Sequence, residues 1–377
     1  MAGTTLNSQL TTAGTARVPF ALATPADDAE VRRLLRENPM PGQITLTLER
    51  EPDYFADASL PGTEKQTIVA NEGGRLVCMG NCSIRERFVN GQPRRVGYLG
   101  GLRLDLRATG RFDILRRGYE FFRELQADRP ADFYFTSIAA DNAPARTFLE
   151  RGLPGMPAYE FIGEFVTVLL PIESRASDHT EPEAEALDFG ELLECLDKHG
   201  RDYQFAPRWS GVELSALQSL NLKADDFQVM RNSGRINACA ALWDQRAFKQ
   251  TVIRGYTPWL ALARPAVNFA ARIIGTPRLP AVGSTLAHAF VSHLAIAQGG
   301  MEALLELVTK LGALAAERGI EFLTLGFAAN DPRLGMLCRK FRCREYRSRI
   351  YVVRWPGLGG PARELDGRCL GPEVALL

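Results

Sequence analysis

Hydrophobic and polar positions divide the first half of the chain into alternating strands and helices. The run from Arg95 to Leu104 predicts a strand, and apolar residues at a spacing near 3.6 predict a helix from Phe112 to Leu125. The β-rich run from Phe133 to Ile138 predicts a second strand, which is followed by a short helix from Ala143 to Arg151. A further strand is predicted at Phe161 to Leu170.

The second half of the chain repeats this order. Its strands and helices are predicted to alternate as Leu286 to Ile296, Met301 to Glu317, Phe322 to Phe327, Pro332 to Phe341 and Arg349 to Trp355. On corresponding strands, Leu102 and Leu294 lie 192 residues apart, and Ala139 and Ala328 lie 189 residues apart. Two offsets this similar predict that one fold was duplicated.

Elements upstream of each repeat also correspond. Cap residues predict a helix at Thr24 to Asn38 in the first half, and helices at Asp188 to His199 and Ser210 to Leu220 in the second. Hairpin strands follow these helices in both halves, at Thr67 to Arg85 and at Asp226 to Trp243. Each half is therefore predicted to be a mixed α/β unit.

Local composition predicts the boundaries of these units. The segment 173–186 is rich in acidic residues and has no apolar residue larger than Ala, so we expect it to link two separately packed domains, 18–172 and 187–355. Residues 1–17 are Thr-, Ala- and Gly-rich and predict a disordered tail. Residues 356–377 are rich in Gly and Pro and predict a loosely wrapped tail.

Composition and charge exclude several classes of protein. A hydrophobic content of 46% excludes a disordered chain, and a net charge of +1 excludes a uniformly basic nucleic-acid-binding protein. The chain has no run of 18 uncharged apolar residues, so no membrane span is predicted. Seven scattered cysteines and four histidines fit neither a disulfide framework nor a metal cluster, so we expect a cytoplasmic protein without a metal.

Positive charge is nevertheless concentrated in two segments. Arg85 to Glu124 contains ten arginines against five acids, a net charge of +5. Arg333 to Arg354 contains seven arginines and one lysine against one acid, a net charge of +7. Such segments are typical of phosphate-binding surfaces, and equally of solvated helix faces or an RNA-binding surface.

Two short motifs follow strands in the first half. One runs from Leu104 to Phe112 (LDLRATGRF), and the other runs from Asn142 to Gly152 (NAPARTFLERG). With the order of elements, these motifs resemble the GNAT superfamily of acyl-CoA-dependent N-acyltransferases, over roughly 18–172 and again over 186–355. The resemblance implies an α/β fold of two tandem GNAT-like domains, each a mixed twisted sheet flanked by helices. It also implies acetyl-CoA or another acyl-CoA as co-substrate.

The resemblance further implies a cofactor site, in which the turn after the central strand wraps the pyrophosphate of CoA at the start of a helix. The implied cofactor-binding residues are Leu102, Arg103, Leu104, Arg107, Thr109, Gly110, Arg111, Phe112, Asn142, Arg146 and Phe148. The chain departs from the family pattern where Leu106 replaces a usual Pro, Thr109 a usual Arg or Gln, and Phe112 a usual Gly. The corresponding loop of the second half has no basic residue, so we expect the cofactor in the first half. Gly110 could equally only begin a helix, and Asn142 only cap one.

Direct acyl transfer needs a group that handles protons and a backbone N–H that polarises the thioester carbonyl. Tyr98 and Tyr134 are the candidate catalytic residues on the first-half strands. In the second half, His288 and His293 share a strand, and their separation of five residues predicts opposite faces. Phe148 stands where many GNAT relatives carry a Tyr that protonates the leaving thiolate, so that acid is lost or lies elsewhere.

Three functions stay open. The first is an acyl-CoA-dependent N-acyltransferase of the acetyltransferase type, which acts on the amine of a small molecule or peptide. The second is a noncatalytic CoA or ligand sensor or assembly module. The third is an aminoacyl-tRNA-dependent transferase, although a nucleic-acid partner is not expected because no long helical arm is inserted in the second half. The acceptor and the oligomeric state are not defined by the sequence.

Two segments fall outside the repeated order. The insertion from Trp243 to Pro280 mixes aromatic residues with Arg264 and Arg272, so it could contact a lipid or an acyl chain. An amphipathic helix packed on the protein's own core is the expected alternative. The loop from Tyr203 to Trp209 either shapes an acceptor pocket or plugs it.

Overall fold

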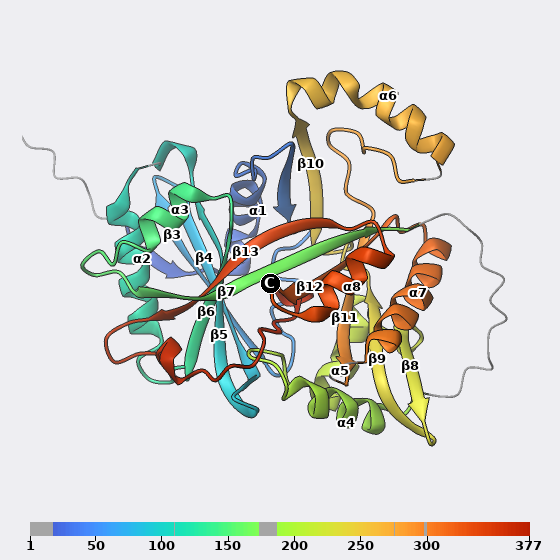
Figure 1. Ribbon diagram of the computed structural model, residues 1–377. Helices are drawn as coiled ribbons and strands as arrows, with labels where there is room; N and C mark the ends of the chain where they lie inside the picture. Colours follow the sequence, from blue (N-terminus) through green and yellow to red (C-terminus); the bar gives the residue numbers. More distant parts are fainter. Residues whose placement is uncertain (1–17, 109, 173–186, 275, 298–299) are drawn as a thin grey trace, which may run out of the picture.

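The computed structural model describes residues 18–108, 110–172, 187–274, 276–297 and 300–377 (Figure 1). The first half contains β1 (Phe20–Leu22), α1 (Asp28–Arg36), β2 (Ile44–Glu49), β3 (Thr63–Glu72), β4 (Arg75–Val89), β5 (Gln92–Leu104), α2 (Phe112–Leu125), β6 (Phe133–Ala139), α3 (Ala143–Leu149) and β7 (Ala158–Pro171). The second half contains α4 (Phe189–Gly200), α5 (Gly211–Leu217), β8 (Phe227–Asn232), β9 (Arg235–Trp243), β10 (Gln250–Tyr256), α6 (Pro258–Ile274), β11 (His288–Ile296), α7 (Met301–Glu317), β12 (Phe322–Ala328), α8 (Pro332–Lys340) and β13 (Arg344–Arg354). The predicted tail 1–17, the predicted linker 173–186 and Thr109 lie outside the described residues.

The main sheet has eleven strands in the order β1-β3-β4-β5-β6-β13-β7-β12-β11-β9-β8. The pairs β5–β6 and β11–β12 are parallel, and the strands around them pair in antiparallel fashion. Helices cover both faces, because alternate residues of a strand point to opposite sides. On β9, for example, Ala240 packs in the core beneath α7, whereas Cys239 and Ala241 pack beneath α4. The expected α/β fold with a mixed sheet flanked by helices is confirmed.

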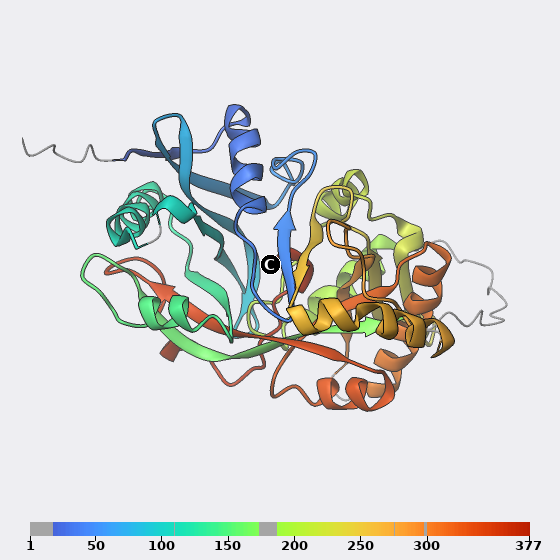
Figure 2. The ribbon, with the colours of Figure 1, turned by 90° about the horizontal axis from the view of Figure 1, so that it is seen from above.

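The two halves of the chain exchange their last strands. The final strand of the second half, β13, pairs with β6 and β7 of the first half, and β7 pairs in turn with β12. Figure 2 shows β7 and β13 running side by side across both halves. The halves therefore share one sheet and are not packed separately. Hydrophobic patterning identified both strands but not their partner strands. A strand has the same pattern whether its buried neighbours belong to the first half or to the second.

A second, two-stranded sheet also joins the halves. In it β10, from the insertion in the second half, pairs in antiparallel fashion with β2 of the first half. Helix α6 follows β10 and stands away from the rest of the molecule (Figure 1). Of its large apolar residues only Leu260 is buried. The expectation of an amphipathic helix packed on the protein's own core is therefore wrong for α6.

The segment that follows β13 returns to the middle of the molecule and does not wrap loosely, contrary to our expectation (Figures 1 and 2). Trp355, Leu358, Leu370 and Ala375 are each at most 7% exposed. Its last turn, Val374–Leu376, packs against β11 and β12. Glycine and proline interrupt regular structure, but single apolar side chains between them can still fill gaps in a core.

Replacing Leu370 by alanine is therefore expected to lower the free energy of unfolding by about 2–3 kcal/mol, because it opens a cavity in a packed core. Leu370 packs beside Phe205 and Ile350, in the core around β5, β6 and β13. Leu106, which is 70% exposed, provides the matched control. Leu106→Ala should change stability by less than ~0.5 kcal/mol in the same urea titration. Equal effects of the two substitutions would contradict a packed tail.

Candidate functional site

Each half contains one place where two parallel strands part. Strands β5 and β6 pair from Val96 and Phe133 as far as Leu99 and Thr136, and then separate. Strands β11 and β12 pair only as far as Phe290 and Thr324. Beyond these points the two strands no longer pair, so backbone N–H and C=O groups lose their strand partner. We call these two places the openings of the first and second halves.

A β-bulge lies on the central strand at each opening. Opposite β4, the ladder of β5 shifts at Gly101 and Leu102, and Gly101 has φ +61°. Opposite β9, the ladder of β11 shifts at His293 and Leu294, and His293 has φ +52°. The two bulges lie 192 residues apart, the offset that the sequence indicated for Leu102 and Leu294. A bulge redirects the backbone and side chain at the point where a site is built.

The second-half bulge also corrects the prediction for the two histidines. His293 stacks on Trp209, with ring centroids 3.9 Å apart, and packs against the core that also holds Phe290. Because the bulge adds one residue, His293 lies on the same face of the sheet as His288 and Phe290, not on the opposite face. His288 Nδ1 lies 3.0 Å from Thr324 Oγ1. Both histidines are buried, and burial lowers the pKa of His288 to about 4 and of His293 to about 3.

The opening in the second half is filled by the chain's own tail. The backbone N–H of His293 donates to Oε2 of Glu373 over 3.0 Å. Residues 370–374 line what remains, a cavity of about 70 Å³ bounded by Trp209, Val291 and Phe327. A carboxylate oxygen of the protein itself thus occupies the position next to the bulge.

Glu373 gives this tail a pH-dependent contribution to stability. Burial raises its pKa from 4.5 to about 7, although N–H donors from His293 and Ala375 and the charge of Arg85 oppose the shift. The folded protein therefore holds a proton that the unfolded chain releases between these pH values. The stability from this proton is complete below pH 4.5 and is lost as the pH rises through about 7.

Glu373→Gln should remove this effect. Relative to the variant, the unmodified protein is expected to lose roughly 2–3 kcal/mol of unfolding free energy between pH 5 and pH 8. Urea titrations of both proteins at these two pH values measure the difference. The histidine shifts act in the opposite direction, but they are common to both proteins and cancel. Parallel pH profiles would contradict the raised pKa.

The opening in the first half has a different lining. Where β5 and β6 part, the hydroxyl of Tyr98 lies 2.8 Å from Ser137 Oγ, and Thr136 Oγ1 donates to the carbonyl oxygen of Leu99. Burial raises the pKa of Tyr98, so its hydroxyl stays protonated. Gly101 has no side chain, and an added Cβ would lie 2.4 Å from Asn81 Nδ2. Tyr98 and Gly101 thus lie at the base of this opening.

The turn after β5 places several of the predicted cofactor residues. Asp105 accepts from the backbone N–H of Arg107 and from the guanidinium of Arg75, which holds the pKa of the Asp105 carboxyl below its usual range. Gly110 has φ +86° with open space around it, which suits a turn leading into α2. Arg111 pairs with Glu72 over 3.0 Å. The turn is therefore organised by ion pairs, and its Arg111 is already partnered.

The short helix α3 meets the start of α2 at this opening. Phe112, 58% exposed, stacks on Phe148 with ring centroids 4.8 Å apart. Asn142 Oδ1 accepts from the backbone N–H of Ala145, which makes Asn142 a helix cap. Nε of Arg146 is buried without a hydrogen-bond partner in the described part of the chain. The structure thus brings together predicted residues from two separate motifs.

The remaining predicted residues divide between the strand and the core. Leu102 is 39% exposed on β5, Leu104 packs beside Ala108 and Ile114, and burial lowers the pKa of Arg103. Tyr134 is fully buried, where its hydroxyl accepts from Ala131 N and donates to Gln126 Oε1. Burial raises its pKa to about 12. Tyr134 therefore lies in the core and not in the opening. Its side chain points to the other face of the sheet, because alternate residues of β6 point to opposite faces.

Several arginines of the two basic segments form ion pairs within the fold. Arg85 pairs with Glu213, and Arg95 pairs with Glu64. In the second segment, Arg333 pairs with Asp331, Arg347 with Glu345, and Arg354 with Glu160. Counting charges within each segment misses the partners Glu213, Glu64 and Glu160, because these acids lie outside the two segments.

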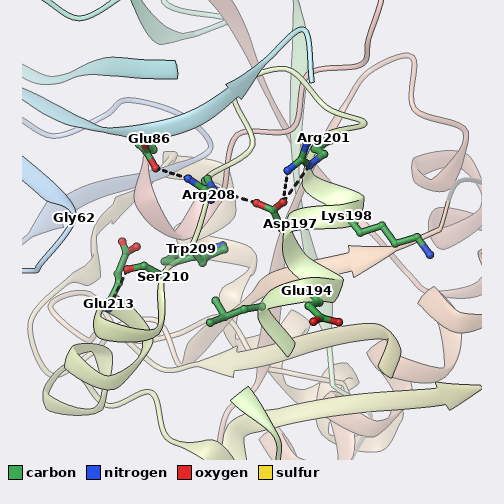
Figure 3. A pocket seen from close by; sticks show the side chains of 11 residues that line it. Gly62, Glu86, Glu194, Asp197, Lys198, Arg201, Arg208, Trp209, Ser210 and Glu213 are labelled. Atoms are coloured by element: carbon green, nitrogen blue, oxygen red, sulfur yellow. Dashed lines mark hydrogen bonds and ion pairs between the residues drawn. The ribbon is translucent and has the colours of Figure 1, made fainter. Parts of the chain in front are cut away.

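A separate pocket of about 800 Å³ lies where α4 and the start of α5 face β4 (Figure 3). A chain of ion pairs crosses it, from Glu86 to Arg208, from Arg208 to Asp197 and from Asp197 to Arg201. The loop that was predicted to shape or plug a pocket forms one wall through Trp209, while its Phe205 stacks on Phe135 in the core. The sequence did not indicate this pocket, because it forms only where Gly62 and Glu86 of the first half meet α4 and the start of α5.

Solved structures with the same fold place these openings in context. A GCN5-related N-acetyltransferase from Sphaerobacter thermophilus matches 91% of this chain and 99% of its own length, with 13% identity and a TM-score of 0.55. An N-myristoyltransferase from Saccharomyces cerevisiae with bound myristoyl-CoA matches 95% of this chain and 91% of its own, with 11% identity and a TM-score of 0.59. No protein-family model and no curated protein matches the sequence. The chain therefore has the GNAT fold, which confirms the resemblance at the level of structure.

The described residues contain neither a metal-binding group nor a helix that could cross a membrane. They contain no group of three His, Cys, Asp or Glu side chains that could hold a metal ion. In the same residues, no helix is long and apolar enough to cross a membrane.

Proposed function

We propose that this protein is an acyl-CoA-dependent N-acyltransferase whose first half binds the acyl-CoA. One observation carries the proposal. In the second half, the N–H at the bulge donates to a carboxylate oxygen of Glu373, so the bulge geometry presents a donor to an oxygen ligand. In the first half the corresponding N–H belongs to Gly101. A thioester carbonyl oxygen can there take the place that the Glu373 oxygen takes in the second half.

The first-half opening also has groups suited to the rest of CoA. The start of α2 and the turn before it present backbone N–H groups and a positive dipole end to a pyrophosphate. Arg103 lies on β5, Arg107 in the turn after it and Arg146 on α3, and Arg111 becomes available if a phosphate displaces Glu72. The second half has only about 70 Å³ left at the equivalent place, which supports binding in the first half.

The chemistry requires one proton to leave the amine and one to reach the thiolate. The amine nitrogen forms a bond to the thioester carbon, the carbon–sulfur bond breaks, and the N–H of Gly101 stabilises the negative oxygen between these steps. We assign the role of acid to Tyr98, whose protonated hydroxyl lies at the base of the opening, and the amine proton leaves to water. Phe148, stacked on Phe112, cannot donate a proton.

The donor and acceptor remain parts of the proposal. The two similar proteins are named for transfer of an acetyl and of a myristoyl group, so both acetyl-CoA and myristoyl-CoA are donors to test, with acetyl-CoA first. We propose the amine of a small molecule or peptide as acceptor and the cytoplasm as location, which suits seven cysteines that are all free thiols.

Isothermal titration with CoA, acetyl-CoA and myristoyl-CoA tests the site. Arg107→Ala/Arg111→Ala is expected to weaken binding about tenfold, because it removes two charges near the pyrophosphate. Arg116→Ala/Arg123→Ala removes the same charge from within α2, beyond the turn that precedes this helix, and should leave binding unchanged. Absence of binding by any of the three ligands would overturn the proposal.

A noncatalytic CoA sensor is the second candidate, and the stacked pair of Phe112 and Phe148 favours it. The pair puts two phenyl rings where relatives carry a glycine and a tyrosine, so this part of the site has lost a proton donor. Release of free thiol from acetyl-CoA across a panel of amines separates the two candidates. Binding without release would assign the sensor.

A further inference from the structure

Helix α6 presents an apolar stripe to solvent. Trp259, Leu262, Phe269 and Ile273 follow one another at spacings of three, seven and four residues, so they share one side of the helix. Their exposed fractions are 59%, 85%, 68% and 72%. Six of the fifteen exposed large hydrophobic residues in the described chain belong to this one helix of 17 residues. Exposed apolar surface this concentrated marks an interaction site.

The opposite side of α6 is fastened to the protein, so the stripe does not face outward by accident. Asn268 exchanges two hydrogen bonds with the backbone of Leu279, which lies on the returning segment. Arg264 donates to the carbonyl oxygen of Leu279. The hydroxyl of Tyr256, on β10, donates to the carbonyl oxygen of Pro280 over 2.7 Å. These bonds fix the rotation of the helix about its axis and hold the stripe toward solvent.

The segment that carries the stripe lacks acidic residues. Between Asp244 and Glu302 the chain has no acidic residue, although it contains 44 acids in 377 residues overall. The same stretch contains six basic residues, among them Arg272 on α6 and Arg278 on the returning segment, both of which are exposed. An apolar stripe with exposed arginines and no acid complements a surface that is apolar beneath and negative on top.

We propose that α6 docks the protein onto an anionic lipid bilayer, with the helix lying in the interface. The apolar stripe enters the boundary between headgroups and acyl chains, Trp259 lies at headgroup level, and Arg272 and Arg278 contact lipid phosphates. A second copy of this chain is the poorer occupant, because two stripes face to face would bring arginines together without an acid on either helix. This docking is independent of acyl transfer.

Vesicle flotation tests the proposal on the full-length protein. Vesicles of phosphatidylcholine alone are compared with vesicles that also contain phosphatidylglycerol, at low and high salt. Leu262→Ser/Phe269→Ser is expected to weaken binding to the anionic vesicles at least about tenfold, because it removes two large apolar groups from the bilayer. Leu22→Ser/Val212→Ser changes two exposed apolar residues elsewhere on the surface and should bind like the unmodified protein.

Each outcome decides the matter. Binding that needs anionic lipid, weakens with salt and is lost in Leu262→Ser/Phe269→Ser supports docking. An Arg272→Glu/Arg278→Glu variant should lose the preference for anionic lipid. Failure to bind anionic vesicles, or equal binding by the stripe variant and its control, overturns the proposal. If the unmodified protein is a dimer in size-exclusion chromatography and only Leu262→Ser/Phe269→Ser is a monomer, the stripe binds a second copy of the chain. That result would also overturn the proposal.

Discussion

Arg85→Ala is expected to lower the free energy of unfolding by about 3–5 kcal/mol, because it leaves a buried carboxylate without its counter-charge. Nη2 of Arg85 lies 2.7 Å from Oε1 of Glu213, and the two side chains are 2% and 4% exposed. The guanidinium also lies over the ring of Trp209, 4.3 Å from its centroid. Because Arg85 is on β4 and Glu213 is on α5, the pair joins the two halves of the chain. Urea unfolding of Arg85→Ala and the unmodified protein measures the loss.

A double variant separates the ion pair from the shape of the site. Arg85→Met/Glu213→Leu replaces both charges with apolar groups, and it should lie within ~1 kcal/mol of the unmodified protein, since paired buried charges contribute little net stability. Glu213→Leu alone should resemble Arg85→Ala, because it leaves a buried guanidinium. If all three variants lost the same stability, packing and not charge would explain the effect.

Gly101→Val is expected to reduce kcat/KM for acyl transfer by about 10²–10³, the usual effect of removing one oxyanion donor. At φ +61° a β-branched residue is strained, and its Cβ would lie 2.4 Å from Asn81 Nδ2, so the backbone at the bulge must shift. The N–H that we assign to the thioester carbonyl then moves out of place. Steady-state kinetics with acetyl-CoA and an accepted amine measures the change.

Gly234→Val is the matched control. Gly234 has φ +80° in the turn between β8 and β9, with nothing near its position to obstruct a side chain. The strain should lower its stability by about 1–3 kcal/mol, as in Gly101→Val, but should leave kcat/KM unchanged. Thermal unfolding of both variants confirms that they are folded. Equal kinetic losses would attribute the effect at Gly101 to strain in general.

Hydrophobic periodicity predicted the elements well because it reflects burial, which acts locally. The stripe of Met301 to Glu317 and the apolar run after it correspond to α7 and β12. Periodicity could not predict the exchange of β7 and β13, since any buried sheet position satisfies the same pattern. Periodicity also predicted an amphipathic helix in the insertion, but it could not show which way the apolar side of α6 faces. An apolar stripe that faces solvent has the same sequence pattern as one that faces a core.

The candidate site could be predicted only in part, because sequence motifs show local features and not partners that are distant along the chain. The motifs after β5 and β6 located the opening, and Gly101 lay between predicted residues without being selected. An alignment offset of 192 matches Gly101 with His293, but the positive φ that the two residues share is visible only in the structure. Glu373 and Arg85 could not be found, because their roles depend on partners that are distant in sequence and belong to no motif.

The exchanged strands set the order in which this protein can complete its fold. The ladder between β7 and β13 joins residues such as Phe165 and Ser348, which are 183 positions apart. During synthesis, β6 and β7 therefore leave the ribosome well before β13, and their edges stay open until almost the whole chain has been made. Such non-local pairing slows folding and exposes strand edges that favour aggregation. Efficient production of this protein should thus depend on chaperone capacity and growth temperature more than on the stability of either half.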